Sequence, residues 1–429
     1  MAVETNPAAP VSFRRDIAPI FVRKCQSCHG LDKNKGGYRL HTFELLMKKG
    51  DGDSPPIVAG QPERSELYRL ITASDEEDRM PQKGAALPSA EIHSIEEWIR
   101  EGARFDGTDP KTPLAAIIPR LQHPSPPAAY PEPVPILAIA VNPSGGEIAT
   151  SGYHEINIWR RSDGALLQRI TNVAERILSL AYNRNGSSLA AATGTPGQIG
   201  ELLWIDRHSN SPVRVLTNTP DVMVAVCFSP VEDLMAAGGS DNAIRIYDGS
   251  GRERRIIQQH ADWIVDLCFS ADGKQLLSAS RDRTARVFEV GTGELESTYA
   301  GHEAPLFAAC FVGNGTTAAS AGRDRKIHLW TVSSGKKIKD VDGFEGEALR
   351  LVAATNRFFT ACSDGKAREY NSKDGKLVRT FSGQKDWIYT AAVNARELVS
   401  GCFDGYVRFW NVETGDSLMS FVAAPGFSP

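Results

Sequence analysis

The sequence predicts a small all-α domain followed by an all-β propeller of seven blades. Three observations support this. After residue 135, an aromatic residue recurs seven times, at spacings of 45, 43, 41, 42, 40 and 40 residues. Before residue 110, apolar residues follow helical spacing. Nine of the 25 prolines fall between Pro110 and Pro135. We therefore place a domain at residues 1–109, a semi-rigid Pro-rich linker at 110–135 and the propeller at 136–429.

The first domain begins and ends with a predicted helix. Ser12 can cap the first helix, Ser89 can cap the last, and Gly102 fits just past its end. The apolar faces of the two helices consist of Phe13, Ile17, Ile20 and Phe21, and of Ile92, Ile95, Trp98 and Ile99. Gly-rich and Pro-rich loops with at most short helices lie between them. We expect a thin core, which in a domain this small usually needs a cofactor, a metal or another staple.

The propeller is predicted from a repeat of about 40 residues that contains four short strands. One block reads WIVDLCFSADG, KQLLSASRD, RTARVFEVGTG and ELESTYAGH, with turn pairs between alternating apolar positions. The aromatic series is Trp159, Trp204, Tyr247, Phe288, Trp330, Tyr370 and Trp410. A second series precedes it, formed by Asp241, Asp282, Asp324, Asp364 and Asp404. Seven aromatic residues in one register indicate seven blades.

This repeat resembles the WD-repeat family over about 290 residues, although the Trp-Asp pair itself is missing. The family's buried tetrad is matched once in full, by His302, Ser320, Asp324 and Trp330. His260, Ser278 and Asp282 are similar, but Phe288 cannot donate a hydrogen bond. The last block keeps its own fourth strand, GDSLMSFV, so we do not expect the family's usual closure by strand exchange.

Composition excludes several classes of protein. The net charge is −4, whereas a protein that binds nucleic acid along its backbone needs a positive surplus. No apolar run approaches the roughly 20 residues that span a bilayer. Seven cysteines are too few for a disulfide scaffold, and we interpret the five in the repeats, Cys227, Cys268, Cys310, Cys362 and Cys402, as small buried residues.

The other two cysteines lie in CQSCH, which gives Cys25, Cys28 and His29 directly after the first helix. This spacing is the attachment motif of c-type haem. Two thiols add to the two vinyl groups, and the adjacent imidazole then reaches the iron. A redox dithiol and half of a zinc site are the alternatives, but neither a βαβ pattern nor a second ligand pair accompanies the motif. We therefore predict covalently attached haem c as the cofactor.

The sixth iron ligand has four candidates, which are Met47, Met80, His41 and His93. Met80 lies in the loop DRMPQKG, before the last helix and beside Pro81 and Gly84. Met47 follows Phe43 at helical spacing and reads as a core residue. We therefore predict His29 and Met80 as the two iron ligands, although an exposed loop methionine is the alternative for Met80.

The first domain resembles the Planctomycete-type cytochrome c domain over about residues 10–106. The segments that carry the resemblance are SFRRDIAPIFVRKCQSCHG, GGYRLHTFE, SPPIVAGQPERSELYRLIT, DRMP and IEEWIREGA. The resemblance implies a His/Met haem c held by Cys25, Cys28, His29 and Met80. Such domains are found fused to WD-repeat propellers. Haem c is attached outside the cytoplasm in bacteria, so we expect a periplasmic protein whose leader was removed ahead of MAVETNPAAP.

Three functions fit these features. The first, which is the function we predict, is single-electron transfer through the haem, with the propeller docking a redox partner protein or another protein or peptide. The second is a haem enzyme similar to the nitrite reductases that join a cytochrome c domain to a propeller, although those propellers resemble eight blades. The third is a scaffold or haem-based sensor. The acidic run at residues 75–78, beside Met80, is either a solvated loop or a docking rim for a basic partner.

Overall fold

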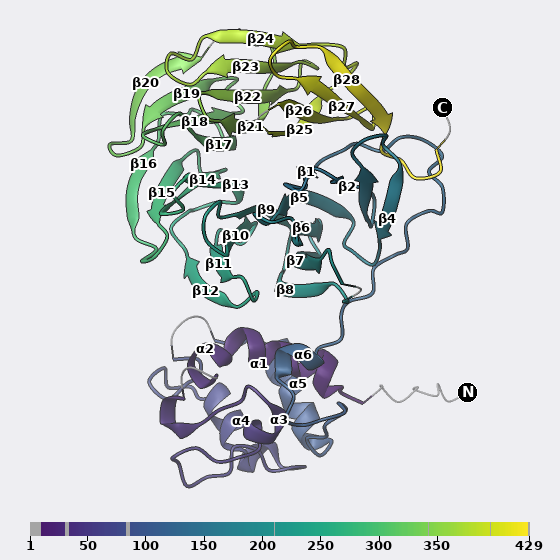
Figure 1. Cartoon of the computed structure of the whole chain (residues 1–429). Coiled ribbons are helices and arrows are strands. Elements are labelled where there is room, and N and C mark those ends of the chain that lie inside the picture. Colours follow the sequence, from purple (N-terminus) through teal and green to yellow (C-terminus); the bar gives the residue numbers. More distant parts are fainter. Residues whose placement is uncertain are drawn as a thin grey trace, which may run out of the picture. The chain divides into compact units, whose positions relative to one another are not determined.

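The computed structural model describes residues 10–30, 34–82, 86–209, 211–341, 343–394 and 396–427. Its internal contacts divide the chain into two compact units, residues 1–121 and 122–429. The first unit is helical and the second is a seven-bladed β-propeller, which confirms the predicted fold class (Figure 1). The segment MAVETNPAA and Gly84, which entered the sequence predictions, lie outside the described residues.

The first unit consists of short helices joined by loops. They are η1 (Phe13–Ile17), α1 (Ala18–Lys24), α2 (Gln26–His29), η2 (Lys35–Gly37), α3 (Phe43–Leu46), η3 (Pro62–Arg64), α4 (Glu66–Ile71), α5 (Ser89–Arg100) and α6 (Leu114–Ile117). The Ser12 hydroxyl accepts a hydrogen bond from the Arg15 amide at 3.1 Å, so the predicted cap is confirmed. Gly102 follows α5 with φ 100°, a conformation that glycine adopts without strain.

Aromatic side chains fill the core of the first unit. Phe13 lies at its centre, with ring centroids 5.2 Å from Trp98 and 4.8 Å from Phe43. Phe43 in turn lies 4.6 Å from Phe105. The expectation of a thin core is therefore wrong, because the loops between the helices contribute apolar side chains that helical periodicity does not reveal.

Each blade of the propeller is an antiparallel sheet of four consecutive strands. The first four blades are β1 (Ile139–Val141), β2 (Glu147–Ser151), β3 (Ile156–Arg160), β4 (Leu166–Ile170); β5 (Arg176–Tyr182), β6 (Ser188–Thr195), β7 (Ile199–Asp206), β8 (Arg214–Thr219); β9 (Met223–Phe228), β10 (Leu234–Gly239), β11 (Ile244–Asp248), β12 (Glu253–Ile257); and β13 (Ile264–Phe269), β14 (Gln275–Ser280), β15 (Ala285–Glu289), β16 (Leu295–Tyr299). The last three are β17 (Leu306–Val312), β18 (Thr317–Gly322), β19 (Ile327–Thr331), β20 (Lys336–Val341); β21 (Ala348–Ala354), β22 (Arg357–Cys362), β23 (Ala367–Asn371), β24 (Leu377–Phe381); and β25 (Ile388–Val393), β26 (Glu397–Cys402), β27 (Tyr406–Asn411), β28 (Ser417–Val422).

The aromatic series explains why the blades share one register. All seven members lie on the third strand of their blade, and all are buried between neighbouring sheets. Each contributes a large apolar surface at the same depth, which is the repeated unit of the propeller core. In the described part of the chain, no helix is both long enough and apolar enough to span a membrane.

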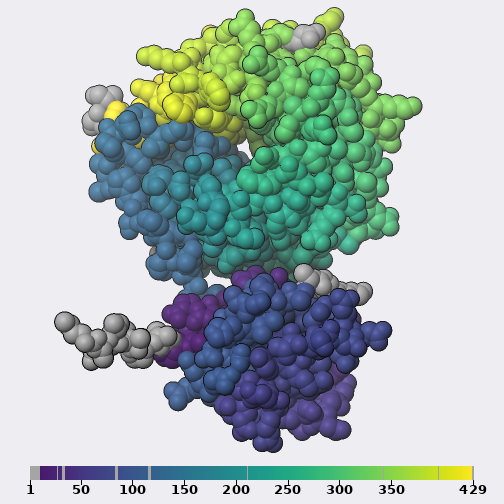
Figure 2. Space-filling view, turned by 180° about the vertical axis from the view of Figure 1, so that it is seen from behind, coloured from purple at the N-terminus to yellow at the C-terminus, as the bar shows by residue number. Residues whose placement is uncertain are grey.

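The ring closes by side-chain packing between the first and last blades. β28 pairs with β27 of its own sheet, so the expectation of closure without strand exchange is confirmed. Ile139 and Trp159 of the first blade pack in one cluster with Phe409 of the last. The Ile136 amide also donates to the Cys402 carbonyl at 3.1 Å. Figure 2 shows the yellow last blade beside the blue first blade.

Residues 122–135 belong to the propeller unit and lie along its first two blades. His123 Nε2 lies 2.8 Å from Glu201 Oε2, and both side chains are almost fully buried. Arg169 donates to the carbonyl oxygens of Pro127 and Ala128, at 2.6 and 2.8 Å. This proline-rich segment is therefore fixed to the propeller by both side-chain and backbone contacts.

Candidate functional site

The end of α1 and the short helix α2 present the Cys-x-x-Cys-His motif. The Cys25 amide donates to the Phe21 carbonyl at 3.0 Å, and the Cys25 carbonyl accepts from the Cys28 and His29 amides at 3.1 and 3.0 Å. These bonds turn the chain once between the two cysteines, so that Cys25, Cys28 and His29 lie on one short helical segment. Both cysteines are free thiols.

His29 is oriented through its Nδ1 atom, which lies 3.3 Å from the Tyr38 carbonyl oxygen. The Leu40 amide also donates to the His29 carbonyl at 2.9 Å, which ties α2 to the segment after η2. A hydrogen bond from Nδ1–H to a backbone carbonyl selects the tautomer in which Nε2 carries the lone pair. This is the usual way in which proteins orient a histidine that binds a metal.

Burial raises the pKa of the Cys25 thiol to about 12, and the nearby Glu91 carboxylate adds to the effect. Buried side-chain atoms in this unit without a hydrogen-bond partner among the described residues include Gln26 Nε2, His41 Nδ1 and Glu91 Oε2. Unpaired buried polar atoms cost free energy unless another group satisfies them. The two thiols, the oriented imidazole and the unsatisfied polar atoms fit a covalently held haem.

The candidates for a sixth ligand lie in different environments. Met80 and Met47 are both partly buried against the same apolar core that Cys25 contacts. The Met80 amide donates to the Leu70 carbonyl at 2.9 Å, which fixes the loop after α4. His93 is exposed on α5, and His41 is half-buried. Met80 therefore remains the candidate in a loop, while Met47 lies at the end of α3 as the sequence predicts.

The propeller carries its polar clusters in the turns between the second and third strands. In the fifth blade, His302 Nδ1 lies 2.8 Å from Asp324 Oδ2, and His302 Nε2 lies 2.9 Å from Ser320 Oγ. Trp330 Nε1 donates to the same hydroxyl at 3.2 Å. The predicted tetrad is therefore confirmed in full.

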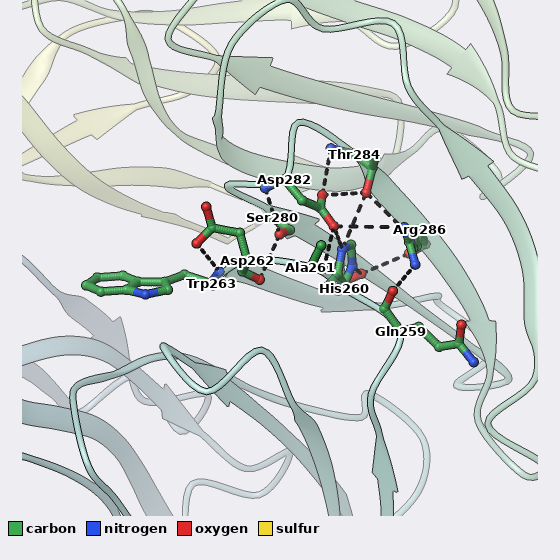
Figure 3. Close-up of polar contacts among 10 residues, drawn as sticks. Gln259, His260, Ala261, Asp262, Trp263, Ser280, Asp282, Thr284 and Arg286 are labelled. Carbon is green, nitrogen blue, oxygen red and sulfur yellow. Dashed lines mark hydrogen bonds and ion pairs between the residues drawn. The ribbon is translucent and has the colours of Figure 1, made fainter.

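The fourth blade has the same arrangement without the indole donor. His260 lies 2.7 Å from both Asp282 Oδ2 and Ser278 Oγ. Figure 3 shows His260 facing Asp282, with Thr284 and Arg286 joined to the same carboxylate. These bonds hold the pKa of Asp282 well below its ordinary value although burial opposes them.

Sequence reasoning missed a second way of satisfying the turn aspartates. In the third, sixth and seventh blades, an arginine four residues after the aspartate takes the place of the histidine. The pairs are Arg245 with Asp241 at 2.5 Å, Arg368 with Asp364 at 2.6 Å and Arg408 with Asp404 at 2.6 Å. The recurrence of Arg four positions after Asp was the signal in the sequence.

Two further propeller histidines lie in different environments. His154 is buried and its Nδ1 lies 3.1 Å from the Val173 carbonyl oxygen, while His208 is exposed in the turn after β7. The five propeller cysteines are free thiols; Cys310, Cys362 and Cys402 are buried as predicted, whereas Cys227 and Cys268 are half-buried. One unpredicted ion pair joins the inner strands of two blades, Arg350 on β21 to Asp266 on β13, at 2.6 Å.

Two family models match the chain. One, described as Planctomycete cytochrome C, covers residues 25–84. The other, described as WD domain, G-beta repeat, matches four times, at residues 210–248, 251–289, 293–331 and 375–411. The chain therefore joins a segment similar to the first family to a seven-bladed propeller in which four segments match the WD repeat.

The curated proteins that are similar to this chain are WD-repeat proteins. The nuclear distribution protein nudF of Aspergillus niger is 25% identical over 290 residues, 66% of this chain and 59% of that protein. The nuclear distribution protein PAC1 of Coccidioides posadasii is 29% identical over 180 residues, 39% of this chain and 38% of that one. Protein SOF1 of Saccharomyces cerevisiae is 24% identical, over 35% of this chain and 30% of its own. The chain thus spans between 30% and 59% of the length of these relatives.

Among solved structures, the computationally designed Ika8 protein superposes with a TM-score of 0.54 at 21% identity. The match covers 68% of this chain and 89% of that one. At this identity the likeness shows the fold alone, and it extends over the larger part of the chain.

These findings correct the predicted function. Single-electron transfer with a redox partner protein is wrong as the function of this chain, because the curated relatives are WD-repeat proteins and support a WD-repeat scaffold. Among the described residues, no group of three His, Cys, Asp or Glu side chains could hold a metal ion. The error arose because the prediction rested on a motif of five residues, whereas most of the chain, residues 122–429, forms the propeller unit.

Proposed function

We propose that the chain is a WD-repeat scaffold whose propeller binds a protein partner through the loops at one end of the blades. The observation that carries this is a pair of exposed aromatic side chains on the seventh blade. Trp387 and Phe403 are each 46% exposed. The Phe403 amide donates to the Trp387 carbonyl at 2.8 Å, so the two loops that carry them are joined. Exposed aromatic residues on rigid loops are typical of protein interfaces.

Tyr389 extends this aromatic surface. Its ring centroid lies 6.1 Å from that of Trp387 and 6.2 Å from that of Phe403. The loops are anchored from below by Asp404, which pairs with Arg408, and by Gln384, which donates to Ser400 at 2.6 Å. A partner that covers this surface therefore meets side chains whose backbone is already ordered, which lowers the entropic cost of binding.

A photo-cross-linking amino acid at position 387, in the full chain and in its native cells, tests this function. We expect one discrete protein adduct on irradiation. The matched control places the same amino acid at Leu295, which is 42% exposed on the outer strand β16, where we expect no adduct. Equal labelling from both positions, or none from position 387, would contradict the scaffold function.

We also propose that Cys25 and Cys28 hold haem c, with His29 and Met80 as the iron ligands. Support comes from the free thiols, the imidazole oriented through Nδ1 and the unsatisfied polar atoms around them. A bound haem would supply a redox-active iron. Its covalent attachment would require the two thiols, while Tyr38 would keep the imidazole turned toward the iron. The periplasmic location stays a prediction that depends on this haem.

Mass spectrometry of the purified full chain tests the cofactor. We expect one covalent haem per chain, lost when Cys25→Ala and Cys28→Ala are combined. The control is Cys227→Ala together with Cys268→Ala, which removes two propeller thiols and should leave the added mass unchanged. An unmodified wild-type chain, purified from cells that attach haem to other cytochromes, would refute the proposal.

A further inference from the structure

Two neighbouring blades present the same three-residue turn, Arg-Asp-Arg. Arg281–Arg283 connects β14 to β15 in the fourth blade, and Arg323–Arg325 connects β18 to β19 in the fifth. The two turns lie 42 residues apart in the chain and are structurally equivalent. The Arg281 amide donates to the Trp263 carbonyl at 3.0 Å, and the Arg323 amide donates to the Pro305 carbonyl at 2.9 Å.

The aspartate of each turn points inward. The side chains of Asp282 and Asp324 are only 8% and 5% exposed, and each carboxylate is paired with the histidine of its blade. Their negative charge is therefore compensated inside the blade and contributes little to the charge of the surface. Figure 3 shows the Asp282 carboxylate directed toward His260.

The arginines flanking these aspartates are exposed, which places four guanidinium groups on two adjacent turns. Among the described residues, no ion pair with a carboxylate is formed by Arg281, Arg283, Arg323 or Arg325. The Arg281 guanidinium carbon lies 4.6 Å from the centroid of the Trp263 ring, a stacked position that restricts its motion. In the adjoining loops, Glu303 pairs with Lys326 at 3.4 Å and Asp262 accepts a hydrogen bond from the Trp263 amide at 2.7 Å.

The fourth and fifth blades are those in which the turn aspartate has an arginine on both sides. The same turns carry Ser240 and Asn242 in the third blade, and Phe403 and Gly405 in the seventh. The chain as a whole has a net charge of −4. A local cluster of unpaired guanidinium groups on a slightly acidic protein is a surface that attracts carboxylates, because each guanidinium can bind a carboxylate through two parallel hydrogen bonds.

We propose that these two turns, residues 281–283 and 323–325, bind an acidic peptide segment of the protein partner, rich in Asp and Glu. The proposal rests on the scaffold function above and names the chemistry of what the scaffold recognises. Trp263 lies beside Arg281 and offers an apolar surface for the stem of a bound side chain. The aromatic surface of the seventh blade is a separate contact, so either can fail without the other.

The test measures binding of a fluorescein-labelled oligoglutamate peptide to the full chain by anisotropy. The variant combines Arg283→Asn with Arg325→Asn. Both positions have positive φ, 70° and 59°, and the third blade already has Asn242 there with φ 63°, so the turn keeps its conformation. We expect the dissociation constant to rise about tenfold at low salt, since two exposed charge pairs are lost, and the difference to shrink in high salt.

The matched control combines Arg184→Asn with Arg396→Asn. These exposed arginines lie in the β5–β6 and β25–β26 turns, which are at the opposite end of the blades. The charge change and the new side chains are the same, so we expect a change of less than about twofold. Oligoglutamine should not bind to the wild-type chain.

Equal weakening in the variant and the control would overturn the proposal, because the effect would then come from net charge. Tighter binding of an oligothymidine strand than of oligoglutamate would also overturn it, in favour of nucleic acid. If oligoglutamate does not bind while the adduct at position 387 forms, this inference fails and the scaffold function stands.

Discussion

Removing the aspartate of the fifth-blade tetrad should loosen one turn of the propeller without unfolding the ring. In the wild-type chain, Asp324 accepts hydrogen bonds from His302 Nδ1 at 2.8 Å and from the amides of Glu303 and Lys326, both at 3.1 Å. Asp324→Ala leaves these three donors without the carboxylate. With about 1 kcal/mol for each lost bond, the local free energy of opening should fall by about 3 kcal/mol, which corresponds to about 100-fold faster exchange.

Hydrogen–deuterium exchange with mass spectrometry measures this directly, on peptides that contain Glu303 and Lys326. The fourth blade is an internal control, because Asp282 accepts from the Ala261 and Thr284 amides at 3.1 and 2.9 Å in the same geometry. Those amides should exchange at the wild-type rate in Asp324→Ala and become fast in Asp282→Ala. Unchanged exchange at Glu303 and Lys326 in Asp324→Ala would refute the view that this carboxylate organises the turn.

Three further predictions concern the propeller. Trp330→Phe gives the fifth blade the aromatic residue of the fourth blade and removes the indole hydrogen bond to Ser320. It should therefore lower the free energy of unfolding of the propeller by about 1 kcal/mol, measured by urea unfolding followed by circular dichroism. A larger loss of stability than in the cavity-forming Trp330→Ala would contradict this. Burial lowers the pKa of His328 from 6.5 to about 4. The unfolded chain therefore binds a proton that the folded chain excludes. The free energy of unfolding should fall by up to about 3 kcal/mol as the pH drops from 6.5 toward 4, and it should fall less in His328→Gln. An equal loss in the wild-type chain and the variant would exclude this histidine as the cause. Arg350→Leu leaves Asp266 buried without its partner. It should lower the free energy of unfolding by about 3 kcal/mol at neutral pH, and by less in acid, where the carboxylate takes up a proton. A loss of stability that does not depend on pH in thermal melts would argue against this mechanism.

The fold class follows from the sequence because the propeller repeats one solution seven times. A single buried aromatic residue carries little information, but Trp159 and its six equivalents fix the third strand of every blade. The missing strand exchange also follows, because the last block contains the residues of β28. The packing of the first unit does not follow, since Phe43 and Phe105 reach the core from a short helix and a loop that periodicity does not identify.

The candidate sites are only partly readable from the sequence. Motif spacing locates Cys25, Cys28 and His29, but the contacts around them, such as the Tyr38 carbonyl, come from chain segments brought close by folding. Arg350 and Asp266 lie 84 residues apart and meet only because their strands face each other inside the ring. Function was misjudged for a related reason, since a short chemical motif outweighed the much longer repeat.

The turn aspartates explain how this propeller can depart from the letters of the WD repeat and still keep its geometry. A buried carboxylate between the second and third strands must find a donor, because an unpaired buried charge costs several kcal/mol. The fourth and fifth blades supply a histidine from the preceding loop, as His260 does for Asp282. Three other blades supply an arginine from the following strand, as Arg408 does for Asp404. Residues beside the aspartate can face outward with either solution, since Phe403 next to Asp404 is also exposed. In the fourth and fifth blades these flanking residues are the four arginines for which we propose an acidic partner.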